Sequence, residues 1–104
     1  MTDLTQFYNP DGPERCGVIT STGEVVELDN ICPEPLQGFE ISTEDLIAFS
    51  EMTECFWHTH PGTSSNLSME DYQSMLMWPR QKHIIIGSDG VSTYRVIDGV
   101  LRRD

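Results

Sequence analysis

The chain has 104 residues, a net charge of −11 and no apolar run that approaches the ~20 residues of a membrane-spanning helix. This length accommodates one domain with one hydrophobic core, and it excludes architectures of about 250 residues such as the (β/α)₈ barrel. Because so acidic a surface repels phosphate groups, we do not expect the protein to bind nucleic acid.

The predicted secondary structure combines short β-rich segments with two helices. In chain order the elements are strands at 16–21 and 24–28, a loop at 30–38, a short extended piece at 39–41, a helix at 43–52, a strand at 55–59, a loop at 61–67, a helix at 69–77, and strands at 83–86, 91–97 and 100–102. Pro33 and Pro35 exclude regular structure from the first loop. Ser42 is placed to cap the first helix, and Pro79 ends the second. This order predicts a single small domain over residues 1–104, of the α/β or α+β class, with a central mixed sheet flanked by helices.

The three cysteines, Cys16, Cys32 and Cys55, cannot all be paired within one chain, and none belongs to a Cys-x-x-Cys motif. We therefore expect reduced thiols and a cytoplasmic protein. The N-terminus agrees with this expectation, because it is acidic and lacks the basic and apolar regions of a signal peptide.

Negative charge is concentrated in the first three quarters of the chain. Before Pro79, fourteen acidic residues accompany a single basic residue, Arg15. The simplest interpretation is a solvated face that aids solubility. The alternatives are steering of a basic partner or concentration of metal cations.

The most informative segment contains the pair His58 and His60, followed at fixed spacing by Ser68 and Asp71. Side chains at i and i+2 of a strand share one face, so both imidazoles can point at the same atom. Asp71 falls in the first turn of the next helix, from which its carboxylate can return as a third ligand. This ligand set suits Zn²⁺, with other divalent metals as alternatives, and a catalytic zinc site holds three protein ligands and one water.

Each of these residues also has a purely structural interpretation. Ser68 and Asp71 together match the start of a helix, and a single strand histidine more often packs or lies at the surface. The conjunction at fixed spacing favours a metal site. Other His-x-His families fit less well, because Gly62 and Thr63 replace the Asp-His of metallo-β-lactamases and the glutamate of cupins is missing. We expect His83 to be a surface or core residue rather than a fourth ligand.

With these residues the chain resembles the JAMM/MPN family of metallopeptidases. The family motif is an upstream Glu, then His-Ser/Thr-His-Pro, then Ser-x-x-Asp. The matching positions here are Glu14, His58, Thr59, His60, Pro61, Ser68 and Asp71. The segments 13–19 and 30–41 are similar to the entry strand and the connecting segment of the family, so the resemblance spans 13–97.

The resemblance implies a role for each residue and a cytidine-deaminase-like JAMM/MPN architecture. His58, His60 and Asp71 would bind Zn²⁺, which activates a water. Glu14 would accept the proton of that water and deliver it to the leaving amine. Ser68 would donate a hydrogen bond to the developing oxyanion.

The N-terminal part departs from the family pattern. Members usually carry a helix before the glutamate strand, whereas we expect residues 1–12 to form an extended arm with a turn at 9–13. Compact bacterial and phage members, notably the peptidase-like domain of phage tail assembly proteins, resemble the chain best. A phage-encoded protein would reside in the host cytoplasm or in the virion.

The leading hypothesis is a zinc-dependent metallopeptidase that hydrolyses a peptide or isopeptide bond in a peptide or protein substrate. The first alternative is a non-catalytic structural or assembly module, such as a phage tail component, that retains the fold and the metal site and binds a protein partner. A DNA-repair module of the RadC type is a third alternative. Thr59 and Thr63 depart from the RadC pattern, and the acidic surface argues against DNA.

Overall fold

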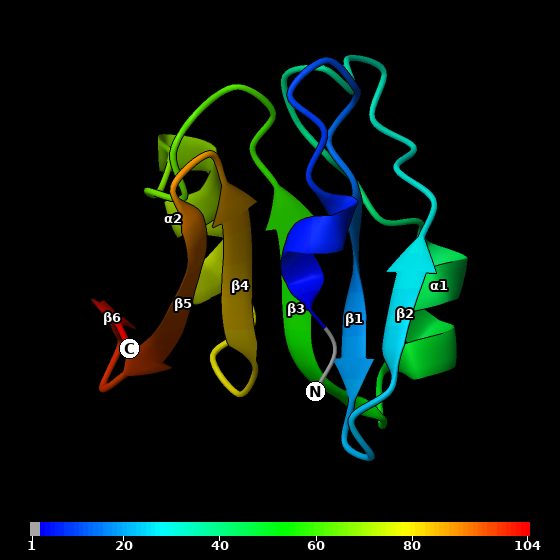
Figure 1. Cartoon of the computed structure of the whole chain (residues 1–104). Coiled ribbons are helices and arrows are strands. Elements are labelled where there is room, and N and C mark those ends of the chain that lie inside the picture. The colour runs from blue at the N-terminus through cyan, green and yellow to red at the C-terminus, as the bar shows by residue number, and fades with distance from the viewer. Residues whose placement is uncertain (1–2) are drawn as a thin grey trace.

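The computed structural model describes residues 3–104, and a mixed six-stranded sheet forms its centre, with strand order β2-β1-β3-β4-β5-β6 (Figure 1). The strands are β1 (Cys16–Thr20), β2 (Val25–Leu28), β3 (Thr53–Thr59), β4 (Lys82–Gly87), β5 (Gly90–Ile97) and β6 (Val100–Arg103). The helices are the 3₁₀ helix η1 (Leu4–Phe7) and the α-helices α1 (Thr43–Phe49) and α2 (Met69–Leu76). Strands β3 and β4 run parallel, and the other neighbours pair antiparallel. The predicted small domain with a mixed sheet and two helices is therefore confirmed as an α+β fold.

The predicted strands, helices and loops all occur, and the segment 39–41, predicted as a short extended piece, forms no strand. A backbone hydrogen bond from the Ile31 N–H to the Glu40 carbonyl (2.9 Å) joins that segment to the preceding loop. Helix α1 is shorter than the predicted 43–52. It ends at Phe49, where a turn at residues 50–52 begins. The Met52 N–H and the Thr53 hydroxyl donate to the Phe49 carbonyl at 3.0 and 2.8 Å, and β3 begins after this turn.

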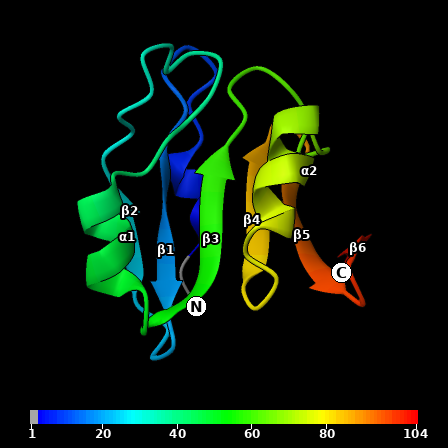
Figure 2. The same cartoon turned by 180° about the vertical axis from the view of Figure 1, so that it is seen from behind.

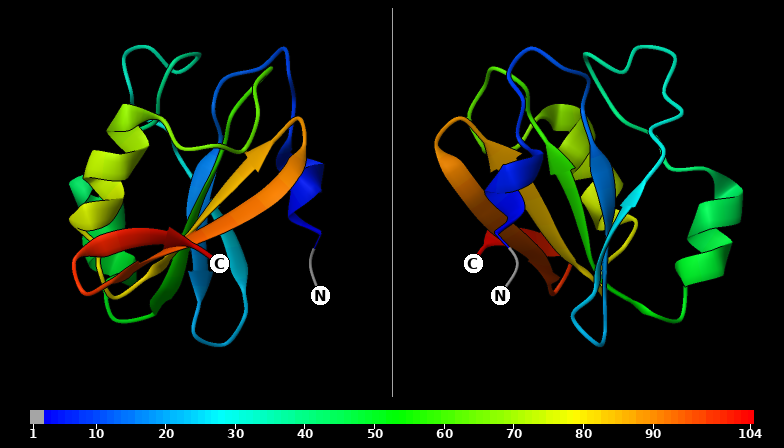
Figure 3. Two further views of the ribbon diagram at one scale, coloured as in Figure 1. Left: turned by 90° about the vertical axis from the view of Figure 1, so that its left-hand side faces the viewer. Right: turned by 45° about the vertical axis from the view of Figure 1, so that its right-hand side comes forward.

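Both α-helices lie on the same face of the sheet, and η1 lies on the other (Figures 2 and 3). The prediction of flanking helices thus holds for one face. On the η1 side, Trp57, Ile84 and Ile86 form a buried cluster. On the helix side, Met75 of α2 packs with the buried side chains of Ile85 and Tyr94. No helix within residues 3–104 is long and apolar enough to cross a membrane.

The N-terminal segment is a packed part of the fold instead of an extended arm. The Phe7 ring stacks on Trp57 with 4.5 Å between centroids, and the Arg15 guanidinium lies 5.0 Å above Phe7. The Tyr8 hydroxyl accepts a hydrogen bond from the Gly62 N–H at 3.1 Å. The predicted turn follows at residues 10–12, and the portion of the predicted arm at residues 1–2 lies outside the described part of the chain. Leu4, Phe7 and Tyr8 pack against the apolar side chains on this face of the sheet. This packing removes that face from water.

Candidate metal centre

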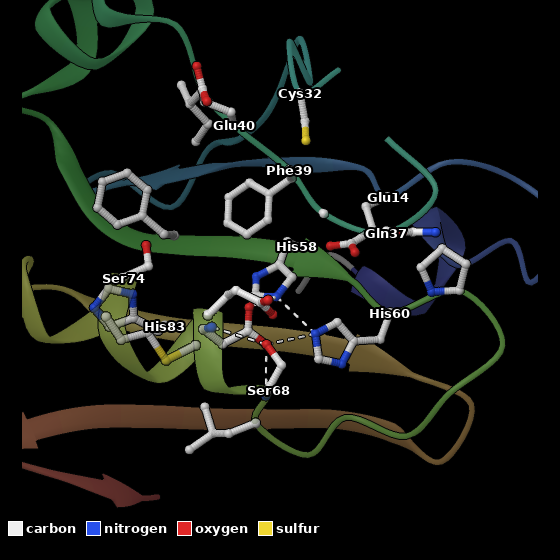
Figure 4. A pocket seen from close by; sticks show the side chains of 18 of the residues that line it. Glu14, Cys32, Gln37, Phe39, Glu40, His58, His60, Ser68, Ser74 and His83 are labelled. Carbon is white, nitrogen blue, oxygen red and sulfur yellow. Dashed lines mark hydrogen bonds and ion pairs between the residues drawn. The ribbon is translucent and has the colours of Figure 1, made fainter. Parts of the chain in front are cut away.

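His58 and His60 converge at the carboxyl end of β3. Their side chains share one face of the strand, as residues two apart do, and their Nε2 atoms lie 3.1 Å apart. The His58 side chain is only 4% exposed, and its ring stacks on Phe39 with 4.3 Å between centroids (Figure 4). The two imidazoles are therefore held in a largely dry environment with their Nε2 atoms facing one another.

Asp71 reaches the two histidines from the first turn of α2. Its Oδ1 lies 3.0 Å from Nε2 of His58, and its Oδ2 lies 2.8 Å from Nε2 of His60. Ser68 caps the helix, because its hydroxyl accepts from the Asp71 N–H at 3.1 Å while its own N–H donates to Oδ2 of Asp71 at 3.2 Å. The capping box therefore orients the carboxylate, and the Ser68 O–H group keeps its proton available for donation.

Glu14 joins the cluster because of strand register. Strand β1 pairs antiparallel with β3, so that Cys16 lies opposite His58 and the entry to β1 lies beside the end of β3. The Arg15 carbonyl extends this pairing by accepting from the Thr59 N–H at 2.9 Å. The ligand atoms of Glu14, His58 and His60 lie within 4.8 Å of one another, so these side chains could hold one metal ion.

The backbone of Glu14 is held by the loop at 30–40. Its N–H donates to the Pro35 carbonyl at 2.7 Å, and its carbonyl accepts from Nδ2 of Asn30 at 2.9 Å. The same Nδ2 donates to the Gly38 carbonyl, and Oδ1 of Asn30 accepts from the N–H groups of two further loop residues, Cys32 and Glu40. One amide side chain thus ties the loop to the entry of β1. Sequence reasoning assigned Asn30 no role, although a polar residue ahead of two prolines is a typical loop organiser.

His60 is oriented by the loop at 61–67. Its Nδ1 lies 3.0 Å from the Ser64 carbonyl, and because a carbonyl only accepts, Nδ1 carries the proton. In the neutral ring, Nε2 is then left with the lone pair that a metal requires, which is the usual arrangement for a histidine ligand.

A buried network fixes that loop against the sheet. The Ser65 hydroxyl lies 2.6 Å from the Ser92 hydroxyl, the Ser65 N–H donates to Oδ1 of Asp89 at 2.8 Å, and the Tyr94 hydroxyl donates to the Ser65 carbonyl at 3.0 Å. Gly87 lies against the backbone of Ser65 so closely that a Cβ would collide with it. Ser65 was missed at the sequence level, because a serine in a Gly/Ser/Asn-rich loop carries no signal of burial.

The pKa values of the two carboxyl groups, those of Glu14 and Asp71, shift in opposite directions. Burial raises the pKa of Glu14 from 4.5 to about 7, and the nearby negative charge of Asp71 adds to this while His60 opposes it. Burial also acts to raise the pKa of Asp71, but the hydrogen bonds from His58 and His60 outweigh it and hold that pKa far below its usual range. Asp71 is therefore ionised at neutral pH, whereas Glu14 exchanges a proton near pH 7.

The pKa values of His58 and His60 also shift in opposite directions. Burial lowers the pKa of His58, and Asp71 only partly offsets this. Burial also acts to lower the pKa of His60, but the bonds to Asp71 and to the Ser64 carbonyl outweigh it, so the net shift is upward. Neutral imidazole is the form that coordinates a metal, and His58 is held in that form.

The donor set fits a divalent metal ion such as zinc. Bond lengths of about 2.0–2.1 Å in a tetrahedral site place neighbouring ligand atoms about 3.3 Å apart. The contacts among His58, His60 and Asp71, at 2.8 to 3.1 Å, already approach this separation. Every sequence-predicted residue of the site, with Glu14 and Ser68 included, lies in this one cluster.

His83 lines the same cleft, but its Nε2 is hydrogen-bonded outside the cluster of His58, His60 and Asp71. Its Nε2 donates to the Trp78 carbonyl at 2.9 Å, its ring stacks on Phe56 with 5.8 Å between centroids, and it is 4% exposed. It is a buried wall residue, in agreement with the core interpretation of the sequence.

Comparison with known proteins informs the fold alone. No family model and no curated protein matches the chain. Among solved structures it is similar to the solution structure of protein DSY2949 from Desulfitobacterium hafniense, with a TM-score of 0.69 and 19% identity over 88% of this chain and 75% of that one. The arrangement of strands and helices is therefore shared with a solved bacterial protein.

Proposed function

We propose that this protein is a zinc-dependent metallopeptidase of the JAMM/MPN type, which hydrolyses a peptide or isopeptide bond, and that its sheet and helices are a compact version of the cytidine-deaminase-like architecture of that family. The observation that carries the proposal is the convergence of Glu14 on His58, His60 and Asp71 at a cleft of about 960 Å³. A cleft of this size accommodates several residues of an extended peptide.

Three side chains would hold the ion, namely His58, His60 and Asp71. Asp71 suits this role because it stays ionised, and His60 suits it because the Ser64 carbonyl holds the proton on Nδ1. When bound, Zn²⁺ supplies a Lewis acid that can lower the pKa of a water from about 15.7 towards 7.

Glu14 is the proton-transfer group in this proposal. Burial raises the pKa of Glu14 to about 7 in the metal-free protein, so this carboxylate takes up a proton far more readily than Asp71 does. Its carboxylate accepts a proton from the attacking water and, as the tetrahedral intermediate collapses, delivers that proton to the leaving amine. Exchanging the roles of the two acids is disfavoured, because the depressed pKa of Asp71 makes it a poor proton acceptor.

Ser68 completes the arrangement. Its Oγ accepts from the Asp71 N–H, which leaves the hydroxyl proton free to donate to the oxygen of the scissile carbonyl as negative charge develops. Because Ser68 is also the cap of α2, the donor position is set by the helix itself.

Metal analysis and a matched pair of variants test the proposal. Protein purified without added metal should contain zinc or bind about one equivalent on titration. Internally quenched fluorogenic peptides should be cleaved by the zinc-loaded protein, and Glu14→Gln should keep the zinc while turnover falls by about 10²-fold or more. Glu24→Gln, an exposed position in the β1–β2 turn, is the control and should leave turnover unchanged.

The outcomes separate the hypotheses. Failure to bind zinc on titration contradicts the whole proposal. Zinc binding with no cleavage of any peptide, and no difference between the wild type and Glu14→Gln, favours the non-catalytic assembly module instead.

A further inference from the structure

The cleft beside the metal centre has two walls and an aromatic end. One wall is the loop at 30–41, which contributes Phe39 and Glu40, and the other is α2 (Figure 4). Beyond the histidines the floor continues to Phe56, whose ring is 5.4 Å from that of Trp78. Trp78 is 37% exposed, so this end presents exposed aromatic surface inside a concave site.

The charge of the cleft has one sign. Three exposed glutamates line it in addition to the metal centre, Glu34 and Glu40 from the loop and Glu70 from α2. Within residues 3–104 no lysine or arginine lines the cleft, and none of these three carboxylates takes part in an ion pair. Several like charges around one concavity attract a cationic ligand over a distance of about 10 Å at 0.1 M salt.

An acceptor that is open to the cleft lies at the aromatic end. Nε2 of His83 donates to the Trp78 carbonyl, so in the neutral ring Nδ1 has only a lone pair. No hydrogen-bond partner of this Nδ1 occurs in the described part of the chain, and the atom is not fully enclosed: His83, 4% exposed as a residue, lines the cleft. Burial lowers the pKa of His83, which keeps the ring neutral and the acceptor available. A ligand at this end is therefore expected to bring an N–H donor.

We infer that the cleft binds a basic peptide segment, with a lysine or arginine side chain seated at the aromatic end. The aliphatic stem packs on Phe56 and Trp78, and its cationic head lies over aromatic faces and donates to Nδ1 of His83. Glu34 and Glu40 attract the remaining positive charge of the segment. This inference rests on the proposed function for its biological meaning, since it names the substrate class of the same site, but the binding itself requires no catalysis.

Peptide binding without zinc tests the inference separately. The probes are three fluorescein-labelled peptides of one length, rich in Gly and Phe, that carry Lys, Met or Glu at the same positions. Fluorescence anisotropy is measured with the full chain in a chelating buffer. We expect the Lys peptide to bind roughly tenfold more tightly than the Met peptide at low salt, with the Glu peptide weakest and with the preference declining as salt is added.

Matched double variants locate the effect. Glu34→Gln with Glu40→Gln and the control Glu24→Gln with Glu51→Gln each change the net charge from −11 to −9, because each removes two negative charges. The first pair should lose most of the preference for Lys over Met, and the control pair should retain it. An equal loss in both pairs would mean that the total charge alone attracts the peptide, and this overturns the inference.

A third variant tests the acceptor. His83→Phe keeps an aromatic ring beside Phe56 but removes Nδ1, and it should weaken binding of the Lys peptide while leaving the Met peptide unchanged. If circular dichroism shows that this variant does not fold, the double variants decide the matter. Cleavage of fluorogenic peptides without any preference for Lys or Arg contradicts the inference and leaves the proposed peptidase intact. A preference for Lys in binding with no cleavage of any peptide supports the inference and contradicts the peptidase.

Discussion

Glu14 should destabilise the metal-free protein at alkaline pH, and Glu14→Gln should relieve this. The pKa of the carboxyl is 4.5 in the unfolded chain and about 7 in the folded one. The folded state therefore binds more protons than the unfolded state between these values, so stability declines as pH rises through this window. Above pH 7 the full difference applies, which corresponds to about 3 kcal/mol at 1.36 kcal/mol per tenfold change.

Glutamine imitates the neutral acid, which makes the substitution a clean test. In a chelating buffer at pH 8, Glu14→Gln should raise the free energy of unfolding by about 3 kcal/mol, and at pH 5 by only about 1 kcal/mol, because the folded-state carboxyl is then protonated. Urea denaturation followed by tryptophan fluorescence measures both values. The control Glu24→Gln, at an exposed position, should change stability by less than about 0.5 kcal/mol at either pH. The reasoning is refuted if Glu14→Gln is no more stable than the wild type at pH 8, or if its gain is the same at both pH values.

Three further substitutions test the supports of the site and the fold. Asn30→Ala removes the amide that joins the loop to Glu14 and should cost about 2–4 kcal/mol in urea denaturation, because four hydrogen bonds are lost. Asn30→Asp should cost at least as much, because it places a carboxylate oxygen against the Glu14 and Gly38 carbonyls. Gly87→Ala should lower zinc affinity at least about tenfold in competition with a chelator, since its Cβ displaces the backbone of Ser65 and with it the loop that orients His60. Unchanged zinc affinity would show that this loop does not position the ligand. Phe7→Ala should cost about 1–3 kcal/mol by removing the stack on Trp57, and zinc affinity measured on the folded variant should not change.

The local features of the site could be predicted because neighbours in sequence determine them. His58 and His60 share a face since they are two apart on a strand, and Ser68 and Asp71 are three apart at a helix start, the spacing of a capping box. The strands and helices were located from periodicity and turn residues, with shifts of a few positions at their ends. The end of α1 was predicted too late, because the Phe49 carbonyl is bonded by the Met52 N–H and the Thr53 hydroxyl in a turn, and the helical periodicity does not reveal this turn.

The residues that hold the site in place act through contacts between segments far apart in the sequence, and the periodicity of the sequence does not predict such contacts. In the sequence, Asn30 and Ser65 are ordinary polar residues of loops. Their roles come from distant partners, because the Asn30 amide donates to the Glu14 carbonyl and Ser65 is hydrogen-bonded to Ser92 and Tyr94. The N-terminal segment likewise has too few residues for a periodic pattern. It folds into η1 because Trp57 and its neighbours leave an apolar sheet face to cover.

The sequence by itself determined the type of fold, the spacing of His58, His60 and Asp71, and the acidity of the surface, because each is a property of composition or of residues near in sequence. The tertiary structure decided that Glu14 stands beside the histidines, since this requires β1 to pair antiparallel with β3 in one register. It also decided the one-sided arrangement of the helices and the shape of the acidic cleft. Strand order and register depend on which side chains become buried when the whole sheet assembles, and this burial involves segments that are far apart in the sequence.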